Sequence, residues 1–250
     1  MKRKILTALA LIILVPVLGI AWLFAQREPP SGPRIAGGPT LVGVEARGAY
    51  AWIIRTAHGA VLVDAGLDTT GAAILKELDA EGVKPGEVQA VLLTHGHPDH
   101  YGAARLFERA SIAIGAGDIN MIRGDKSHYA TFGKVMGAVM PLPPPPRVDV
   151  ALNGGEDLVF DGARFHVVAT PGHSPGSVMY LYQDVLFTGD SLMRKGDGVT
   201  IVPSLFSENA DENRASLQRL QTLPFATIAD GHAGLAVDAK QKLARFLAGS

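Results

Sequence analysis

The sequence contains no cysteine among its 250 residues. Disulfides, zinc–thiolate sites and a cysteine nucleophile are therefore excluded, and any transition metal must be held by histidine, aspartate or glutamate. A strong charge of either sign is also lacking, since the net charge is −1, and no nucleic-acid partner is expected without a concentrated basic patch. What the sequence does have is 29 glycines and 16 prolines, which favour turns and loops over long helices.

The longest hydrophobic run lies at the N-terminus. Three positive charges in "MKRK" precede the uncharged segment 5–25, which as a helix would reach roughly 31 Å, enough to span a bilayer core. The basic flank would place the rest of the chain outside the cytoplasm, in the periplasm or extracellular space. The run is longer than the apolar part of a signal peptide, which favours an uncleaved anchor over a cleaved signal and a secreted protein. We expect an anchor at residues 1–25, a Pro/Gly linker at 26–39 and a catalytic domain at 40–250.

The remainder of the chain alternates short strands with helices. Apolar runs such as "AYAWIIRT", "AVLVDAGL" and "EVQAVLLTH" predict strands, and helical spacing of apolar residues predicts a helix over 70–81. A second helix is expected over "HYGAARLFERA", and two more at 209–223 and 236–246. This order predicts an α/β (α+β) fold of two similar halves packed sheet to sheet, with the four prolines at 143–146 as their join.

A dense cluster of possible metal ligands follows one predicted strand, in the run "THGHPDH". His95 and His97 stand at the strand's end, where a loop can aim both at one point. Pro98 suits the first turn of a following helix, which would hold Asp99 and His100. Nitrogen and carboxylate ligands without sulfur suit zinc, and also iron or manganese. Taken alone, the run is also compatible with a polar loop of helix-capping residues.

Three distant loops repeat one pattern, in which a short apolar strand is followed by glycine and a possible ligand. They read "TPGHSPGS", "LFTGDSL" and "TIADGHAG", and they supply His173, Asp190 and His232. Functional groups at the C-terminal ends of strands are typical of sites in α/β proteins. A single histidine after a strand is more often a capping or surface residue, but the four segments together favour one shared metal site.

The segments "THGHPDH", "PGHSPG", "FTGDSL" and "DGHAG", with "VLVDAG" upstream, resemble the metallo-β-lactamase-fold hydrolase superfamily. The resemblance implies a four-layer αββα sandwich. It also implies two zinc ions per chain and a bridging hydroxide that cleaves an ester, thioester, lactone or related bond. The implied ligands of one ion are His95, His97 and His173, and those of the other are Asp99, His100 and His232, with Asp190 bridging both.

The resemblance also assigns roles to two aspartates. Asp99 would orient the hydroxide and later pass a proton on. Asp64 matches the aspartate of the family's "DAG" and would hold a metal-bound histidine in place. Between the two halves, His128 and Tyr129 are candidates for contact with the substrate.

Departures from particular subfamilies narrow the expected activity. True metallo-β-lactamases generally carry cysteine or serine where Asp190 stands, so the ligand set looks more like that of glyoxalase II, lactonase or phosphodiesterase relatives. The 18 residues after His232 are too few for the C-terminal helical extension of glyoxalase II. We therefore expect a compact, membrane-tethered hydrolase of a small-molecule substrate. A mono-iron persulfide-dioxygenase-like enzyme and a β-lactam-hydrolysing enzyme stay open as alternatives, and no feature of the sequence sets the oligomeric state.

Overall fold

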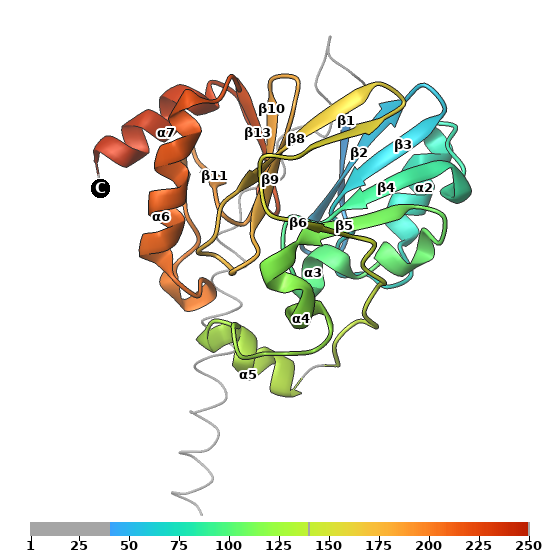
Figure 1. The fold of residues 1–250 in the computed structure, drawn as a ribbon, viewed down its shortest axis with the longest axis horizontal. Helices are drawn as coiled ribbons and strands as arrows, with labels where there is room; N and C mark the ends of the chain where they lie inside the picture. The colour runs from blue at the N-terminus through green and yellow to red at the C-terminus, as the bar shows by residue number, and fades with distance from the viewer. Residues whose placement is uncertain (1–40, 140, 250) are drawn as a thin grey trace, which may run out of the picture.

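A computed structural model describes residues 41–139 and 141–249, in which two six-stranded sheets lie face to face (Figure 1). In hydrogen-bonding order, the strands of the first sheet are β1 (Leu41–Glu45), β2 (Tyr50–Thr56), β3 (Gly59–Val63), β4 (Val88–Leu92), β5 (Ser111–Gly115) and β6 (Val150–Leu152). Those of the second are β14 (Leu235–Ala236), β13 (Thr227–Asp230), β10 (Val185–Gly189), β9 (Val178–Tyr182), β8 (Ala163–Ala169) and β7 (Asp157–Phe160). A separate hairpin joins β11 (Met193–Lys195) and β12 (Gly198–Thr200).

Helices cover the outer face of each sheet (Figure 1). The first sheet carries α2 (Ala72–Ala80) and α3 (Pro98–Tyr101), and the second carries α6 (Ala210–Arg219) and α7 (Ala239–Ala248). The remaining helices and 3₁₀ turns are α4 (Ile119–Ile122), α5 (Thr131–Val139), η1 (Pro85–Glu87), η2 (Ala104–Leu106), η3 (Ala116–Asp118), η4 (Ser204–Phe206) and η5 (Leu220–Thr222). The order of layers is helix, sheet, sheet, helix, so the predicted αββα sandwich is confirmed.

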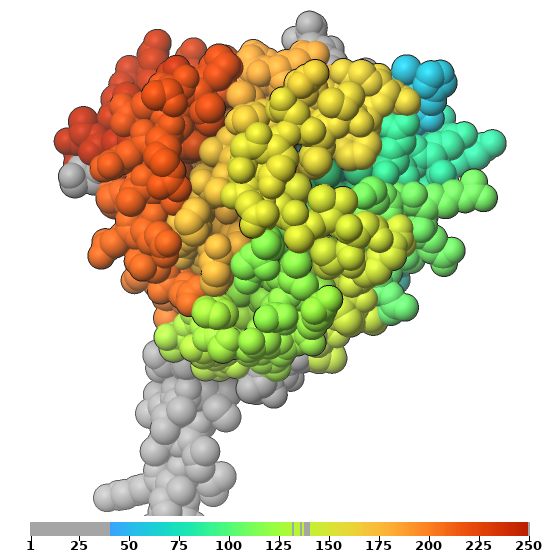
Figure 2. Space-filling model, in the orientation of Figure 1, coloured from blue at the N-terminus to red at the C-terminus, as the bar shows by residue number. Residues whose placement is uncertain are grey.

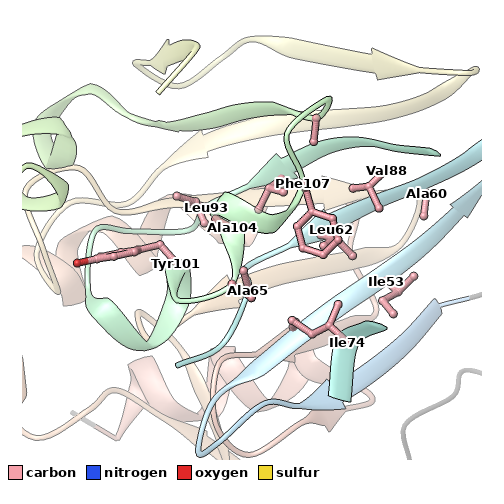
Figure 3. Close-up of a cluster of buried hydrophobic side chains, with 14 of the residues drawn as sticks. Ile53, Ala60, Leu62, Ala65, Ile74, Val88, Leu93, Tyr101, Ala104 and Phe107 are labelled. Carbon is pink, nitrogen blue, oxygen red and sulfur yellow. The ribbon is translucent and has the colours of Figure 1, made fainter. Parts of the chain in front are cut away.

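Three clusters of buried hydrophobic side chains hold the layers together. Along β2, Ile53 packs into the cluster beneath α2, whereas Trp52 and Ile54 pack between the two sheets. This division arises because successive residues of a strand point to opposite faces. Ile74 of α2 and Phe107 belong to the same cluster as Ile53 (Figure 3). A third cluster joins α6 and α7 to the outer face of the second sheet.

The helices at the two ends of the domain agree with the predictions, but the expected helix over "HYGAARLFERA" is wrong. The predicted helices at 70–81, 209–223 and 236–246 appear as α2, as α6 extended by η5, and as α7. In contrast, α3 ends at Tyr101 and is followed only by the short turn η2. The reason is that the amide of Gly102 donates to the carbonyl of Gly66, 2.7 Å away, rather than to its own preceding turn. A side chain at Gly102 would lie only 2.5 Å from that oxygen, so glycine is required for this approach.

The prediction that the prolines at 143–146 join the two halves is also wrong. After these prolines the chain forms β6, which pairs with β5 of the first sheet. The crossing to the second sheet comes later, at residues 153–156, where Gly154 and Gly155 both have φ of 94°. Glu156 stabilises this turn, because its carboxylate accepts the amides of Asn153 and Gly154 at 2.7 and 2.8 Å.

The expected anchor at residues 1–25 and the linker at 26–39 lie outside the described residues. Within 41–139 and 141–249, no helix is both long enough and apolar enough to cross a bilayer.

Candidate metal centre

The fold brings all seven predicted ligands to one place. Their ligand atoms form overlapping groups in which the atoms of each group lie within 4.8 Å of one another. Every one of these side chains follows the C-terminal end of a strand. The strands are β4 for the run from His95 to His100, β8 for His173, β10 for Asp190 and β13 for His232.

One group, here called the three-histidine group, consists of His95, His97 and His173. Its ring nitrogens form a tight triangle, with His95 Nε2 lying 2.9 Å from His97 Nδ1 and 3.1 Å from His173 Nε2. The third edge, between His97 Nδ1 and His173 Nε2, is 3.0 Å. Burial lowers the pKa of His173 to about 3 and that of His95 well below its usual value, with a further contribution from neighbouring histidines. Burial also lowers the pKa of His97, so all three rings favour the neutral form, and one nitrogen of each ring faces the same spot.

The other group, here called the mixed group, consists of Asp99, His100 and His232. Asp99 Oδ2 lies 3.6 Å from His232 Nε2 and 3.9 Å from His100 Nε2. Asp190 stands between the two groups. Its Oδ2 is 3.0 Å from His232 Nε2 and 3.7 Å from His173 Nε2, and its Oδ1 is 3.4 Å from His100 Nε2. A single carboxylate therefore reaches both groups.

Hydrogen bonds at the far side of three rings set which nitrogen faces the centre. His100 Nδ1 lies 2.8 Å from Asp64 Oδ2, and His232 Nδ1 lies 2.7 Å from the carbonyl oxygen of Gly48. His95 Nδ1 lies 3.1 Å from Thr94 Oγ1. When each Nδ1 carries the proton and donates it to its oxygen, each Nε2 keeps a free lone pair for a metal.

Asp64 acts on both groups through these bonds. Its Oδ1 accepts the backbone amide of Thr94 at 2.8 Å, and its Oδ2 accepts the Thr94 hydroxyl at 2.8 Å beside the ring of His100. Asp64 is almost fully buried and has φ of 59°, in the left-handed region that aspartate tolerates better than most residues. The structure thus places Asp64 against His100, the kind of contact expected of it.

The centre has the features of a cation site. His100 Nε2 and Asp190 Oδ1 are buried and, apart from the ion-pair contact of 3.4 Å between them, have no hydrogen-bond partner among the described residues. Buried polar atoms normally have partners, so two that face the same cluster need an explanation. The three ring nitrogens of the three-histidine group lie 2.9–3.1 Å from one another, and a proton on His95 Nδ1 directed at Thr94 would leave His95 Nε2 without a proton to share. Divalent cations at the two groups would satisfy all of these atoms, and the nitrogen and carboxylate donors suit zinc.

Two buried aspartates hold the ligand loops but were not predicted. Asp118 accepts hydrogen bonds from Gly96 and Gly176, which lie in two different ligand loops. Asp230 accepts the backbone amides of His232 and Gly234. Asp118 follows the strand-end pattern that pointed to the ligands, in "SIAIGAGD", and that pattern was a signal for it in the sequence. Asp230 is instead the last residue of β13 and precedes the glycine, so the pattern does not indicate it.

The two candidates for substrate contact occupy different surroundings. Tyr129 is buried, and its ring lies at right angles to that of His97 with centroids 5.3 Å apart. His128 is half-exposed, pairs with Glu208 at 2.7 Å and belongs to neither group of ligand atoms. In Figure 2 the green segment that contains His128 lies against the orange segment that contains Glu208. Tyr129 therefore contacts the metal centre directly, whereas His128 belongs to its surroundings.

The sequence around this centre matches a known protein family. The family model of the metallo-beta-lactamase superfamily matches residues 44–232. The chain belongs to this superfamily. Members of the metallo-beta-lactamase superfamily typically use a dinuclear metal site, and the chain has side-chain groups that can hold one.

Two relatives with similar sequences are both named hydroxyacylglutathione hydrolase. The hydroxyacylglutathione hydrolase of Halorhodospira halophila is 32% identical over 188 residues, which cover 73% of this chain and 60% of the relative. That of Photobacterium profundum is 31% identical over 179 residues, which cover 71% of this chain and 58% of the relative. The chain thus spans about three fifths of the length of these relatives.

Solved structures show the same superfamily fold. A metallo-beta-lactamase family protein from Thermus thermophilus has a TM-score of 0.68 at 25% identity, covering 85% of this chain and 79% of that one. A metallo-beta-lactamase from Cronobacter sakazakii has a TM-score of 0.67 at 22% identity, covering 91% of this chain and 94% of that one. At these identities the similarity establishes the fold alone.

Proposed function

We propose that the chain is a metal-dependent hydrolase with two zinc ions, one at the three-histidine group and one at the mixed group. The observation that carries this proposal is the triangle of neutral ring nitrogens 2.9–3.1 Å apart, with the carboxylate of Asp190 reaching both groups. When bound, two such ions lower the pKa of a shared water and polarise the oxygen of the bond to be cleaved.

The protein's own residues orient the metal ligands, supply negative charge and transfer protons. The hydrogen bonds from Asp64, Thr94 and Gly48 hold the ligand rings in the tautomer that leaves Nε2 free. Asp190 is buried between the groups, and His232 and His100 outweigh burial to hold its pKa well below the usual range. It therefore stays an anion that holds both groups together. The side chain of Asp99 is 35% exposed, so it faces incoming solvent and is placed to accept a proton and release it.

For the substrate we propose a small molecule with a thioester or a related ester or lactone bond. The support is that relatives 31–32% identical to the chain are named for hydrolysis of hydroxyacylglutathione, which is a thioester. The ligand set with aspartate at position 190 supports the same class.

The test is a substrate panel combined with metal analysis. Purified, zinc-loaded protein is assayed on an ester, hydroxyacylglutathione and other thioesters, lactones, phosphodiesters and β-lactams, and the metal content per chain is measured. Two zinc ions per chain with thioester or ester turnover are expected. Turnover of none of these substrates would contradict the hydrolase proposal, and one iron per chain with oxygen consumption would support a dioxygenase instead.

The membrane-anchored, extracytoplasmic location inferred from residues 1–25 is a separate proposal. Its support is the length of the apolar run and its basic flank. N-terminal sequencing of the mature protein tests it, because a protein that starts near Gln26 would contradict an uncleaved anchor.

A further inference from the structure

Asp118 is a buried carboxylate that lies beside the metal centre without being one of its ligands. It closes η3, directly after β5, and its side chain is fully buried. Its Oδ2 accepts the amide of Gly96 at 2.8 Å and the hydroxyl of Ser174 at 2.6 Å. Its Oδ1 accepts the amide of Gly176 at 2.7 Å. Three donors therefore converge on one carboxylate, whose partners come from two loops far apart in sequence.

The three donors have a common relation to the three-histidine group. Gly96 lies between His95 and His97, and Ser174 directly follows His173. Gly176 ends the same loop as Ser174, whose amide is held in turn by the hydroxyl of Ser177 at 3.0 Å. Asp118 thus joins the loop of two of these histidines to the loop of the third.

The backbone around Asp118 packs closely against the two ligand loops, so neither loop can move far without a steric clash. A side chain at Gly176 would lie 2.3 Å from the backbone nitrogen of Asp118, and one at Gly96 would lie 3.1 Å from its Cβ. Gly115 and Gly117, which precede Asp118, likewise approach the backbone of residues 175 and 176. A shift of either loop would therefore strain its contact with Asp118.

The mixed group is held by other carboxylates. Asp64 holds the ring of His100 and also reaches His95 through Thr94, and Asp230 accepts the amides of residues 232–234. Within the described part of the chain, the hydrogen bonds of Asp118 go to Gly96, Ser174 and Gly176 and none goes to the mixed group.

We propose that Asp118 is a positioning residue that sets the nitrogen triangle of the three-histidine group and does not serve the mixed group. This inference rests on the proposed metal centre. The variant Asp118→Asn keeps the size of the side chain but replaces one acceptor oxygen with an NH₂ group. That group must then face a backbone or hydroxyl donor, which moves one ligand loop away from the other. Loss of a partner that orients metal ligands typically lowers metal affinity about 10- to 100-fold.

The experiment is a metal titration of the full chain freed of metal, with Co²⁺ followed by visible absorption and with diamagnetic Zn²⁺ followed by long-range ¹H–¹⁵N spectra of the histidine rings. The wild type is expected to bind two ions. Asp118→Asn is expected to bind one ion with near wild-type affinity and the other about 10- to 100-fold more weakly. The weakened ion is identified by the ring signals of His95, His97 and His173, while those of His100 and His232 still shift.

Two further variants keep the result interpretable. Ser174→Ala removes only one donor and is expected to give a smaller loss at the same group, should Asp118→Asn fail to fold. Asp149→Asn is the matched control, because Asp149 accepts the amide of Ile112 at the other end of β5, and it is expected to leave both affinities unchanged.

Equal weakening of both ions, or no weakening in either Asp118→Asn or Ser174→Ala, would overturn the assignment of Asp118 while the wild type still binds two ions. A wild-type chain that binds no ion would instead contradict the proposed function itself.

Discussion

The three-histidine group and the mixed group lie side by side, yet they differ in charge, exposure and spacing. In the first, burial lowers the pKa of His95 and His173, and the ligand nitrogens are 2.9–3.1 Å apart. In the second, burial alone would lower the pKa of His100, but Asp64, Asp190 and Asp99 outweigh it and raise that pKa well above its usual value. The ligand atoms there are 3.6–3.9 Å from Asp99.

This difference shows how one loop can supply two unlike sites. The first group consists of three imidazoles whose pKa is lowered by burial, with the carboxylate of Asp190 3.7 Å from His173 Nε2, so a cation there has few protons to displace. The second contains one carboxylate and two imidazoles, whose pKa values neighbouring aspartates raise despite burial, so a cation there competes with protons. The contrast between "HGH" and "DH" in the single run "THGHPDH" becomes a contrast between these two environments.

The largest effect is expected from removing the carboxylate that both groups share. Asp190→Ala should lower kcat/KM by about 10⁴-fold, or roughly 5 kcal/mol of barrier, and reduce the metal content below two ions per chain. Steady-state kinetics with metal analysis checks this. The control is Asp197→Ala, since Asp197 is 97% exposed and should leave both values unchanged. A variant with full activity and two ions would mean that Asp190 does not join the groups.

A somewhat smaller effect is expected when one group alone is damaged. His95→Ala should remove the ion of the three-histidine group, retain the other, and lower kcat/KM by about 10³-fold, or roughly 4 kcal/mol of barrier. Metal content near one per chain, with a circular dichroism spectrum like the wild type's, is the expected measurement. His166→Ala is the control, because His166 lies on β8 and pairs with Asp157 outside the centre. Retention of two tightly bound ions by His95→Ala would count against the assignment.

Asp64→Asn tests the carboxylate that holds the ring of His100 in the mixed group. Asparagine tolerates the left-handed backbone at φ of 59°, but it replaces an acceptor of the His100 ring or of Thr94. Metal affinity should fall about 10- to 100-fold, at the mixed group through His100 or at the three-histidine group through Thr94 and His95, as measured by competition with a chelating dye. Asp161→Asn is closely matched, since Asp161 also has positive φ, of 48°, and also faces a histidine, His58 at 3.4 Å. If both variants lowered affinity equally, the effect would not belong to the centre.

The smallest effect is expected at His128, outside both groups. The hydrogen bond to Glu208 raises the pKa of His128 in the folded chain. The pair should therefore stabilise the fold below the ordinary histidine pKa of 6.5 and lose that contribution as the pH rises through the folded value. His128→Gln should cost less than about 1 kcal/mol, because the pair is partly exposed. Urea unfolding of the wild type and His128→Gln at pH 5 and pH 8 checks this. A larger loss of unfolding free energy at pH 8 than at pH 5 would contradict the expected direction of the pH dependence.

The sequence predicted what depends on local chemistry. The strand-end positions of His173, Asp190 and His232 were predictable because a short apolar run followed by glycine signals a strand and its turn. The layered fold was predictable from the order of such runs and from the family resemblance. The metal roles of these side chains, and the substrate roles of His128 and Tyr129, remain predictions.

What the sequence missed depends on contacts between distant segments. The early end of α3 results from a hydrogen bond between Gly102 and Gly66, which no helical spacing reveals. Asp118 is no ligand, so its importance emerges only once Gly96 and Gly176 lie against it. The prolines at 143–146 look like a boundary, yet β6 returns to the first sheet because its pairing with β5 is available there.

Each of the two groups draws its members from both sheets. His95 and His97 follow a strand of the first sheet and His173 one of the second, and the mixed group is divided in the same way between His100 and His232. A bound ion would therefore close a chain loop of more than 70 residues, and closing such loops restricts the unfolded ensemble. With both ions bound, the two halves should unfold as one cooperative unit. Without them, the hydrophobic cluster between the sheets still joins the halves, but the unfolded chain regains the freedom that the closed loops restrict.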